Sequence, residues 1–332
     1  MHVLFQIRED YNKNLAGDSI QMLMTKRHLE DLGVVVDISC DPNVGLDEYD
    51  LVHIFNTVRV KESHAYAVNS LKQDKPYVLS TIYWNMGEYI RKANKANLEW
   101  WRESNYLRKE VLDNASALLP NSQIEKTVLK QDFSIDNKCF IVPNGCHKMF
   151  YRANPMRFIK KYDISDFVLC VGRIAYRKNQ LNLIKALKHT KYTLVLIGPH
   201  TNEKYYDQCR KEANSKTIFM DQMMYGSLAS AYAAAKVHVL PSWFETPGLS
   251  NIEAGLAGCN LVVTDKGSQK EYFKNYAAYC DPSNTESIRR EVIKMYRSRK
   301  TKHLSSHILK NYTWDITAKE TLEAYNYVID NL

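Results

Sequence analysis

The sequence predicts an α/β protein built from two domains, each with a parallel β-sheet between helices. Three observations support this prediction. The 332 residues exceed the size at which a single hydrophobic core stops growing. The composition, 45% hydrophobic and 25% charged, provides ample core-forming residues for a globular protein. Short apolar runs alternate with longer amphipathic stretches, as strands and helices do around a parallel sheet.

Six apolar runs predict the strands of the first domain, which we expect to span residues 1–150. The runs are residues 2–7, 34–39, 50–56, 76–82, 115–120 and 138–143. Between the first two runs, residues 19–33 have apolar side chains at helical spacing and end in Gly33, a common helix stop. The first half therefore follows a strand and helix alternation from its beginning.

The same alternation restarts in the second half, where we expect a second domain over residues 151–312. Its predicted strands are residues 167–172, 192–198, 217–220, 237–241 and 260–265, with helices at 180–189 and 227–236. Residues 146–166 have weaker periodicity, a proline and several charges, and we interpret them as a linker. Two successive domains of this kind form a cleft, a favoured place for small-molecule sites.

The last 20 residues, 313–332, predict a helix. Ala318, Leu322, Tyr325 and Ile329 recur at helical spacing and indicate a buried stripe. We expect this helix to pack back on the first domain.

Charge and cysteine content limit the classes of function. The formal net charge of +8 is compatible with nucleic acid, an anionic membrane surface or a phosphorylated small molecule. Basic residues are spread along the chain, however, which argues against nucleic acid. The seven cysteines contain no CxxC pair, so neither a zinc site nor a redox motif is indicated. They fit a reducing cytoplasm.

No targeting or membrane-spanning segment is expected. The apolar stretch at residues 2–7 is too short for a signal peptide and predicts a strand. No run approaches the roughly 20 apolar residues of a membrane span. We therefore expect a cytoplasmic protein whose membrane contact, if any, is peripheral.

The stretch PSWFETPGLSNIEAGLAG, residues 241–258, is the most informative part of the sequence. A predicted strand is followed by Glu245, a turn at Pro247 and Gly248, and a predicted helix whose first turn contains Glu253. Ligands bind at this strand-to-helix position in open parallel sheets. Gly248, Leu249 and Ser250 lie at the N-terminus of this predicted helix, where their backbone amides can bind an anion.

Two carboxylates beside an anion site constrain the ligand. A carboxylate repels phosphate, so neither glutamate should bind the phosphate itself. Glu245 and Glu253 should instead hydrogen-bond two neutral, hydroxyl-bearing groups, one on each side of the phosphate. A nucleoside ribose and a sugar joined by a diphosphate have this arrangement.

WFETPGLSNIEA resembles the E-x7-E motif of retaining glycosyltransferases with the GT-B fold, particularly family 4. Four further segments resemble that family in the expected order: residues 117–129, 140–150, 170–187 and 261–273. The resemblance covers most of residues 115–280. It implies two Rossmann-like domains facing a cleft, with the acceptor on the first domain and the nucleotide-sugar donor on the second.

The resemblance also implies roles for individual residues. Arg173 and Lys178 would contact the donor diphosphate, Glu253 the ribose hydroxyls and Glu245 the donor sugar. The implied catalytic residues are Glu245, Arg173 and Lys178, with the alternative that Glu245 only anchors the donor sugar. The implied donor-binding residues are Gly17, Gly172, Arg173, Lys178, Gly198, Met223, Glu245, Pro247, Gly248, Leu249, Ser250 and Glu253.

We expect no metal ion and no cofactor. The chain has no convincing DxD motif of the kind that holds a divalent metal in many sugar transferases. Cationic side chains and helix amides would instead neutralise the leaving diphosphate. The donor is expected to be a UDP- or GDP-linked sugar.

Candidates for acceptor binding lie in the first half: His53, Tyr83, Trp84 and Asn144. His53 could instead be a hydrogen-bonded histidine of the core. Tyr83 stands where many family members have a histidine. Residues 84–109 mix tryptophans with arginines and lysines. This stretch could contact anionic lipid, stack on acceptor sugars, bind single-stranded nucleic acid, or combine a tryptophan-lined core face with a solvated basic face.

The sequence thus predicts transfer of a sugar to a glycan or lipid-linked acceptor, in cell-surface polysaccharide or glycoconjugate synthesis. The alternatives are another GT-B enzyme, such as an epimerase or a phosphorylase, and a non-catalytic nucleotide-sugar-binding subunit. A phosphorylase would need a pyridoxal lysine, which we do not identify. A dehydrogenase is disfavoured because no GxGxxG turn follows the first strand.

Overall fold

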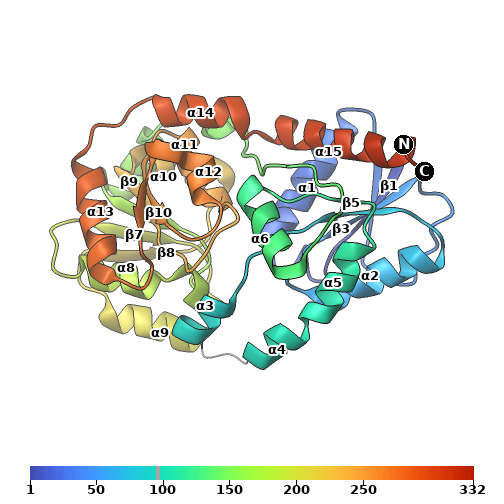
Figure 1. Ribbon diagram of the computed structural model, residues 1–332. Coiled ribbons are helices and arrows are strands. Elements are labelled where there is room, and N and C mark those ends of the chain that lie inside the picture. The colour runs from blue at the N-terminus through green and yellow to red at the C-terminus, as the bar shows by residue number, and fades with distance from the viewer. Residues whose placement is uncertain (95–97) are drawn as a thin grey trace. The chain divides into compact units, whose positions relative to one another are not determined.

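The computed structural model describes residues 1–94 and 98–332, and it contains two compact units (Figure 1). The first unit comprises Met1–Gly87, residues 98–145 and Trp314–Leu332. The second comprises residues 88–94 and Cys146–Thr313. Each unit contains one parallel sheet with alternating helices, so the predicted fold class is confirmed.

The first unit is built on a five-stranded sheet of order β2-β1-β3-β4-β5. The strands are β1 (His2–Gln6), β2 (Val35–Ser39), β3 (Leu51–Phe55), β4 (Tyr77–Ser80) and β5 (Ala117–Leu118). Its helices are α1 (Gly17–Glu30), α2 (Val60–Lys72), α4 (Leu98–Glu103), α5 (Asn105–Asp113), α6 (Gln123–Phe133) and α15 (Trp314–Asp330). All five residues of β3 are buried, as expected where helices cover both faces of a parallel sheet.

The strand predicted at residues 138–143 is wrong. The segment makes only an isolated bridge, between Cys139 and Leu118. The amide of Val142 donates to the carbonyl of Pro120, but Pro120 has no N–H with which to continue a ladder. Apolar composition alone did not reveal this interruption.

Helix α15 packs against α1 within the first unit. Ala318, Ala324, Tyr325 and Val328 are buried in the core that contains Met22 of α1. Leu322 is only partly buried there, and the inward face is centred on Val328 rather than on the predicted Ile329.

The second unit is built on a six-stranded parallel sheet of order β11-β10-β9-β6-β7-β8. The strands are β6 (Val168–Val171), β7 (Leu194–Ile197), β8 (Thr217–Met220), β9 (Val237–Leu240), β10 (Asn260–Thr264) and β11 (Ala278–Cys280). The helices are α3 (Gly87–Tyr89), whose last two residues belong to this unit, then α7 (Met156–Tyr162), α8 (Gln180–Leu187), α9 (Glu203–Glu212), α10 (Tyr225–Ala234), α11 (Leu249–Leu256), α12 (Gln269–Phe273), α13 (Thr285–Arg297) and α14 (His303–Asn311).

Residues 146–166, interpreted above as a linker, are part of this second unit. They contain a short 3-10 helix (Lys148–Phe150) and α7. Phe150 and Phe158 are fully buried in the core with Phe167 and Tyr232. These two helices are too short to show a periodic apolar pattern in the sequence, and they pack into the core mainly through Phe150 and Phe158.

The strand orders define where loops can gather around a ligand. In each sheet the order reverses next to its first strand in the sequence: between β1 and β3 in the first unit, and between β6 and β9 in the second. Loops leaving the carboxyl ends of two such strands diverge and leave room for a ligand. Among the described residues, no helix has both the length and the apolar composition to cross a bilayer.

Candidate functional site

The loops after β6 and β9 carry most of the residues predicted to bind the donor. Gly172 and Arg173 follow β6, and Glu245 follows β9. Gly198 follows the neighbouring β7, and a Cβ atom there would lie 2.4 Å from the carbonyl oxygen of Gly172. Glycine at 198 therefore allows the loops after β6 and β7 to approach closely, as we would expect at a phosphate-binding edge.

Glu245 lies in an ion-pair cluster. Its Oε1 atom accepts a hydrogen bond of 2.5 Å from Lys178 Nζ and one of 3.3 Å from Arg177 Nη1. The carboxylate is buried, with 4% of the residue exposed. Burial alone would raise its pKa, but the positive charges of Lys178 and Arg177 outweigh that effect and lower the pKa to about 2. Glu245 is therefore ionised at neutral pH.

Lys178 has an unusual environment for a lysine. Burial and the neighbouring charge of Arg177 lower its pKa to about 8, although Glu245 opposes the shift. The protein thus stabilises the charged ammonium group of Lys178 less than water does. An anionic ligand that binds beside Lys178 would add a favourable charge interaction.

The backbone of Glu245 is held by the loop after β10. The amide of Ser268 donates a 2.9 Å hydrogen bond to the carbonyl of Glu245. Gly267 has a φ of +89°, and a Cβ atom there would lie 2.0 Å from the same carbonyl oxygen. Only glycine fits this contact, so two loops fix Glu245 together.

The side chain of Glu245 lies beside the start of helix α11. Gly248, with a φ of +82°, precedes the helix, and a Cβ atom there would lie 3.2 Å from Glu245 Oε2. Leu249 and Ser250 form the first helical turn, where backbone amides have no partner within the helix. Pro247 is buried at the base of this turn. The carboxylate of Glu245 and the first turn of α11 are thus neighbours.

Glu253 has the opposite electrostatics. It lies on α11 and accepts a hydrogen bond of 3.0 Å from the hydroxyl of Tyr232. Burial raises the pKa of Glu253 to about 7. No lysine or arginine among the described residues lowers this pKa, so the two glutamates of the motif differ in charge state near neutral pH.

Two basic residues contact Glu245, and the sequence analysis named only one of them. Arg177 also donates to the carbonyl of Phe244, over 2.9 Å. Its position next to Lys178 in one 3-10 turn, Tyr176–Lys178, was the available signal. Arg173, which was predicted to contact the donor diphosphate, is half-buried, and its carbonyl accepts a hydrogen bond from Gln180. Met223 is partly buried against the core.

The predicted acceptor residues lie in the first unit, and His53 and Tyr83 face its interior. The ring nitrogens of His53 contact the hydroxyls of Tyr325, at 2.6 Å, and Ser80, at 2.8 Å. Burial lowers the pKa of His53 to about 3. The hydroxyl of Tyr83 donates to Asp132 over 2.8 Å. Both side chains therefore have structural partners inside the unit.

The other three first-unit candidates are not grouped by any described contact. Asn144 is buried, Trp84 is half-buried, and Gly17 is exposed at the start of α1. A Cβ atom at Gly17 would meet nothing within 4 Å.

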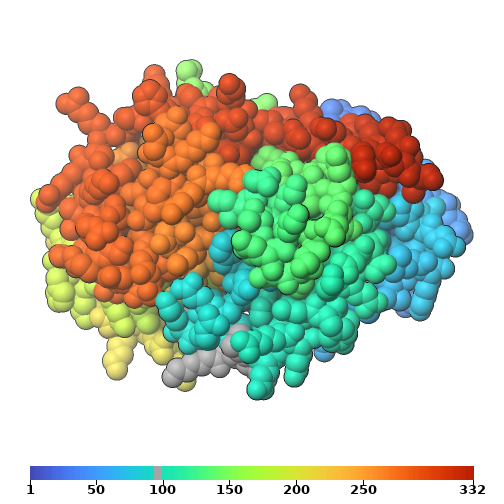
Figure 2. All heavy atoms as spheres, viewed as in Figure 1, coloured from blue at the N-terminus to red at the C-terminus, as the bar shows by residue number. Residues whose placement is uncertain are grey.

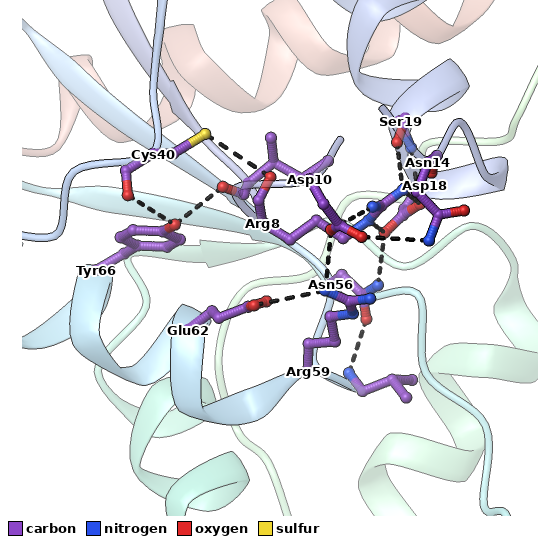
Figure 3. Close-up of polar contacts among 12 residues, drawn as sticks. Arg8, Asp10, Asn14, Asp18, Ser19, Cys40, Asn56, Arg59, Glu62 and Tyr66 are labelled. Carbon is purple, nitrogen blue, oxygen red and sulfur yellow. Dashed lines mark hydrogen bonds and ion pairs between the residues drawn. The ribbon is translucent and has the colours of Figure 1, made fainter. Parts of the chain in front are cut away.

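A group of polar residues that was not predicted from the sequence lies at the β1 and β3 edge of the first unit (Figure 3), and a small pocket lies among them. Arg8 donates to both carboxylate oxygens of Asp18, over 2.9 and 3.2 Å, and to Asp10 over 2.6 Å. Asn56 donates to Asp18 over 3.0 Å. The pocket is lined by Ile7, Arg8, Asp18, Phe55, Asn56, Arg59, Glu62 and Tyr66. The signal for it was the charged segment directly after the first strand.

The basic and aromatic stretch at 84–109 contains both buried and exposed side chains. Arg108 is fully buried, with its guanidinium 3.6 Å from the ring centre of Trp101. It donates to the carbonyl of Thr57, after β3, over 3.1 Å. Trp100 is 47% exposed. Lys95, one of the predicted basic residues, lies outside the described residues.

Comparison with known proteins agrees with this architecture. Residues 154–310 match the family Glycosyl transferases group 1. An uncharacterized glycosyltransferase of Methanocaldococcus jannaschii is 25% identical over 313 residues, which are 86% of this chain and 77% of that protein. The O-antigen chain mannosyltransferase B of Escherichia coli is 21% identical over 235 residues, 65% of this chain and 62% of that protein.

Solved structures share the fold over nearly the whole chain. Sucrose-phosphate synthase of Thermosynechococcus elongatus has a TM-score of 0.83 at 15% identity, covering 100% of both chains. Anabaena HepE, in its complex with UDP-glucose, has a TM-score of 0.80 at 16% identity, covering 98% of this chain and 100% of its own. The fold is GT-B. Together with the family match over 154–310, these similarities support a glycosyltransferase.

Proposed function

We propose that this protein is a retaining glycosyltransferase that moves a sugar from a nucleotide-diphosphate sugar to a glycan or lipid-linked acceptor. The observation that carries the proposal is the cluster at the β6 and β9 edge. There an ionised Glu245 is held by Lys178 and Arg177 beside the first turn of α11. The HepE structure contains UDP-glucose, and this favours a uridine nucleotide.

In this proposal the donor diphosphate binds at the start of α11. The amides of Leu249 and Ser250 and the positive end of the helix dipole attract it. Lys178 and Arg173 neutralise charge as the diphosphate leaves, without a metal ion, and Arg177 adds to their field. Such preorganised charges are commonly a large part of catalysis.

The two glutamates have separate tasks. Glu245 hydrogen-bonds the donor sugar and stabilises positive charge at its anomeric carbon. Glu253 accepts hydrogen bonds from the ribose hydroxyls. The acceptor hydroxyl attacks from the face that the diphosphate leaves, so the anomeric configuration is retained.

The acceptor sugar is assigned to the pocket at the β1 and β3 edge. Its lining has two carboxylates, Asp18 and Glu62, and two guanidiniums, Arg8 and Arg59. Asp10 pairs with both arginines. The guanidinium of Arg8 uses Nε, Nη1 and Nη2 on groups of the protein. The pocket therefore favours neutral hydroxyl groups over an anion.

Two measurements test the donor and the reaction. A nucleotide that binds only the native state raises the melting temperature, so UDP, GDP, ADP and their sugar conjugates are compared by thermal shift. Release of free nucleotide on addition of acceptor then separates an enzyme from a non-catalytic binding subunit, and NMR of the product gives the anomeric configuration. Absence of a shift with all of these nucleotides would contradict the proposal.

The acceptor assignment is tested by Glu62→Gln. A hydrogen bond to a charged group contributes about 1.5–3 kcal/mol, so we expect the acceptor KM to rise about tenfold while the donor KM is unchanged. Glu110→Gln is the matched control, since Glu110 pairs with His64 on the same unit. An unchanged acceptor KM in Glu62→Gln would remove this pocket from the acceptor site.

Peripheral membrane contact remains part of the proposal. Trp100 and Tyr106 are exposed, at 47% and 69%, and Arg102 is exposed between them. Vesicle flotation with and without anionic lipid tests whether they contact a membrane. We expect salt-sensitive binding that weakens in a Trp100→Ala, Tyr106→Ala variant.

A further inference from the structure

Residues 88–94 occupy an unexpected place. In the sequence they follow Gly87 of the first unit and precede α4, which belongs to that unit, yet they pack into the second unit. We call them the 88–94 segment. Figure 1 shows its beginning, α3, beside the helices of the second unit. Figure 2 shows its outer face at the molecular surface, in cyan beside the orange atoms of that unit.

The first contact of the segment is with the loop that carries Glu245. The ring of Tyr89 meets the ring of Phe244 edge-on, with centroids 6.1 Å apart and planes at 69°. The ring centroid of Trp243 lies 6.4 Å from that of Tyr89, with the planes at 46°. Trp243 and Phe244 are buried, so Tyr89 completes an aromatic cluster directly before Glu245.

The second contact is with the other loop that holds Glu245. Glu88 Oε2 lies 3.7 Å from Lys266 Nζ. Lys266 precedes Gly267, whose backbone packs against the carbonyl of Glu245. Glu88 Oε1 also accepts a hydrogen bond of 3.0 Å from Lys92 of the same segment. The 88–94 segment therefore contacts both loops that fix the catalytic candidate.

Arg177 links the aromatic cluster to the carboxylate. Its guanidinium carbon lies 5.1 Å from the centre of the Phe244 ring, and its Nη1 donates to the carbonyl of Phe244 and to Glu245 Oε1. The amide of Trp243 in turn donates to the carbonyl of Arg177, over 2.9 Å. A shift of Phe244 would therefore displace a cation that binds Glu245.

We propose that Tyr89 and Glu88 are positioning residues for Glu245, through which a segment from the first half of the chain sets the geometry of the donor site. The inference rests on the proposed transferase function. Tyr89 holds Phe244 and, through Phe244, Arg177, and Glu88 holds the loop of Gly267. We assign neither residue a contact with the reacting atoms. A small displacement of a positioned group costs up to about a hundredfold in rate.

The test compares Tyr89→Ala with Tyr89→Phe. We expect kcat to fall about tenfold or more in Tyr89→Ala with the donor KM within twofold, because binding contacts remain while Glu245 is misplaced. Tyr89→Phe keeps the ring and should have a kcat close to that of the natural protein. Tyr327→Ala, which removes a partly exposed ring on α15, serves as the control for general loss of stability.

The contact of Glu88 is tested separately with Glu88→Gln, Lys266→Gln and the double variant. If the two residues act together, the effects on kcat will be non-additive, with the double variant no worse than the worse single variant. Additive effects would remove the Glu88 contact from the proposal.

Hydrogen exchange makes the inference independent of activity. We expect backbone amides in residues 241–248 and 265–268 to exchange several times faster in Tyr89→Ala than in the natural protein. Unchanged exchange, or a Tyr89→Phe variant as impaired as Tyr89→Ala, overturns the inference. A natural protein that binds no nucleotide would instead overturn the proposed function, and the exchange experiment would still decide whether the segment holds these loops.

Discussion

The two sheet edges use similar residues for different purposes. At the β1 and β3 edge, Arg8 contacts both carboxylate oxygens of Asp18. Arg8 also donates to Asp10, Ser19 and the carbonyl of Asn14. At the β6 and β9 edge, Lys178 and Arg177 both contact a single oxygen of Glu245, Oε1. The first arrangement ties a loop to a helix, whereas the second concentrates positive charge at one point.

This difference shows that composition does not distinguish a structural ion pair from a reactive one. In both pairs the acid is buried and has a lowered pKa. The distinction lies in what surrounds the acid. Glu245 Oε2 lies beside Gly248, at the start of a helix, whereas both oxygens of Asp18 face the same guanidinium. We therefore expect substitutions at Glu245 to affect turnover and those at Asp18 to affect folding.

The largest expected effect is that of Glu245→Gln on turnover. Loss of the negative charge removes stabilisation of the anomeric carbon, and we expect kcat to fall about a hundredfold to a thousandfold, or about 3–4 kcal/mol. Nucleotide affinity should change by only a few fold, because the helix amides and Glu253 remain. Steady-state kinetics and nucleotide titration measure the two quantities.

The control for this prediction is Glu286→Gln, which removes an exposed carboxylate paired with Arg289 on α13 of the same unit. It should leave both quantities unchanged. Turnover of Glu245→Gln equal to that of the natural protein would exclude Glu245 from the reaction.

Local sequence signals predicted five strands in each unit, but they missed β11 and added a false strand at 138–143. The strands at 167–172, 192–198, 217–220, 237–241 and 260–265 each correspond to an observed strand. The loops after them follow from strand ends, a Pro-Gly turn and a helix start, all of which are local in the sequence. Glu245 and Gly248 could be grouped on these grounds, whereas Lys178 was assigned only through the family resemblance. The structure brings Glu245 next to both of them.

The features that were missed depend on contacts between distant residues. Arg177 was not distinguishable from Arg173, because only the fold shows which arginine reaches Phe244 and Glu245. Asp18 and Asn56 are 38 positions apart and meet only because β1 and β3 are neighbours. The sequence leaves His53 open as an acceptor residue or a core histidine, because its partners Ser80 and Tyr325 come from β4 and α15. Local sequence patterns do not predict hydrogen-bond partners that are this distant in the chain.

An intermediate effect is expected for Asp18→Asn. The substitution leaves Arg8 buried, with 4% of the residue exposed, and without its principal carboxylate. Breaking a buried ion pair by removing one partner typically costs about 3–5 kcal/mol. Because the amide oxygen of the new side chain can still accept one hydrogen bond, we expect a loss of about 3 kcal/mol in the free energy of unfolding of the first unit, at the lower end of that range. Urea unfolding measures it.

Glu30→Gln is the control for this substitution, since Glu30 forms an exposed pair with Lys26 on the same helix. Such pairs contribute about 0–1 kcal/mol. Nucleotide binding to the second unit should persist in Asp18→Asn. A variant as stable as the natural protein would show that the Arg8 network is not structural, and the contrast between the two edges would fail.

The smallest effect concerns Glu253 and is visible only through pH. Its pKa is about 7 in the folded protein, against an ordinary value of 4.5, so the folded state holds the proton more tightly than the unfolded chain. The stability that this group contributes is therefore complete below pH 4.5 and is lost as the pH rises through 7. Glu245, with its pKa lowered from 4.5 to about 2, behaves oppositely, and loses its contribution only as the pH falls below 4.5.

Between about pH 5 and pH 8, then, Glu253 is the member of the motif that titrates. We expect the free energy of unfolding of the natural protein, relative to Glu253→Gln, to decrease by on the order of 2 kcal/mol over this range. Urea unfolding at about pH 5 and about pH 8 measures it, with Glu286→Gln as a variant that should show no such trend. A difference that stays constant with pH would mean that Glu253 is ionised throughout. In that case Glu253 would have a cationic partner or access to water, and the two glutamates would no longer differ in charge state.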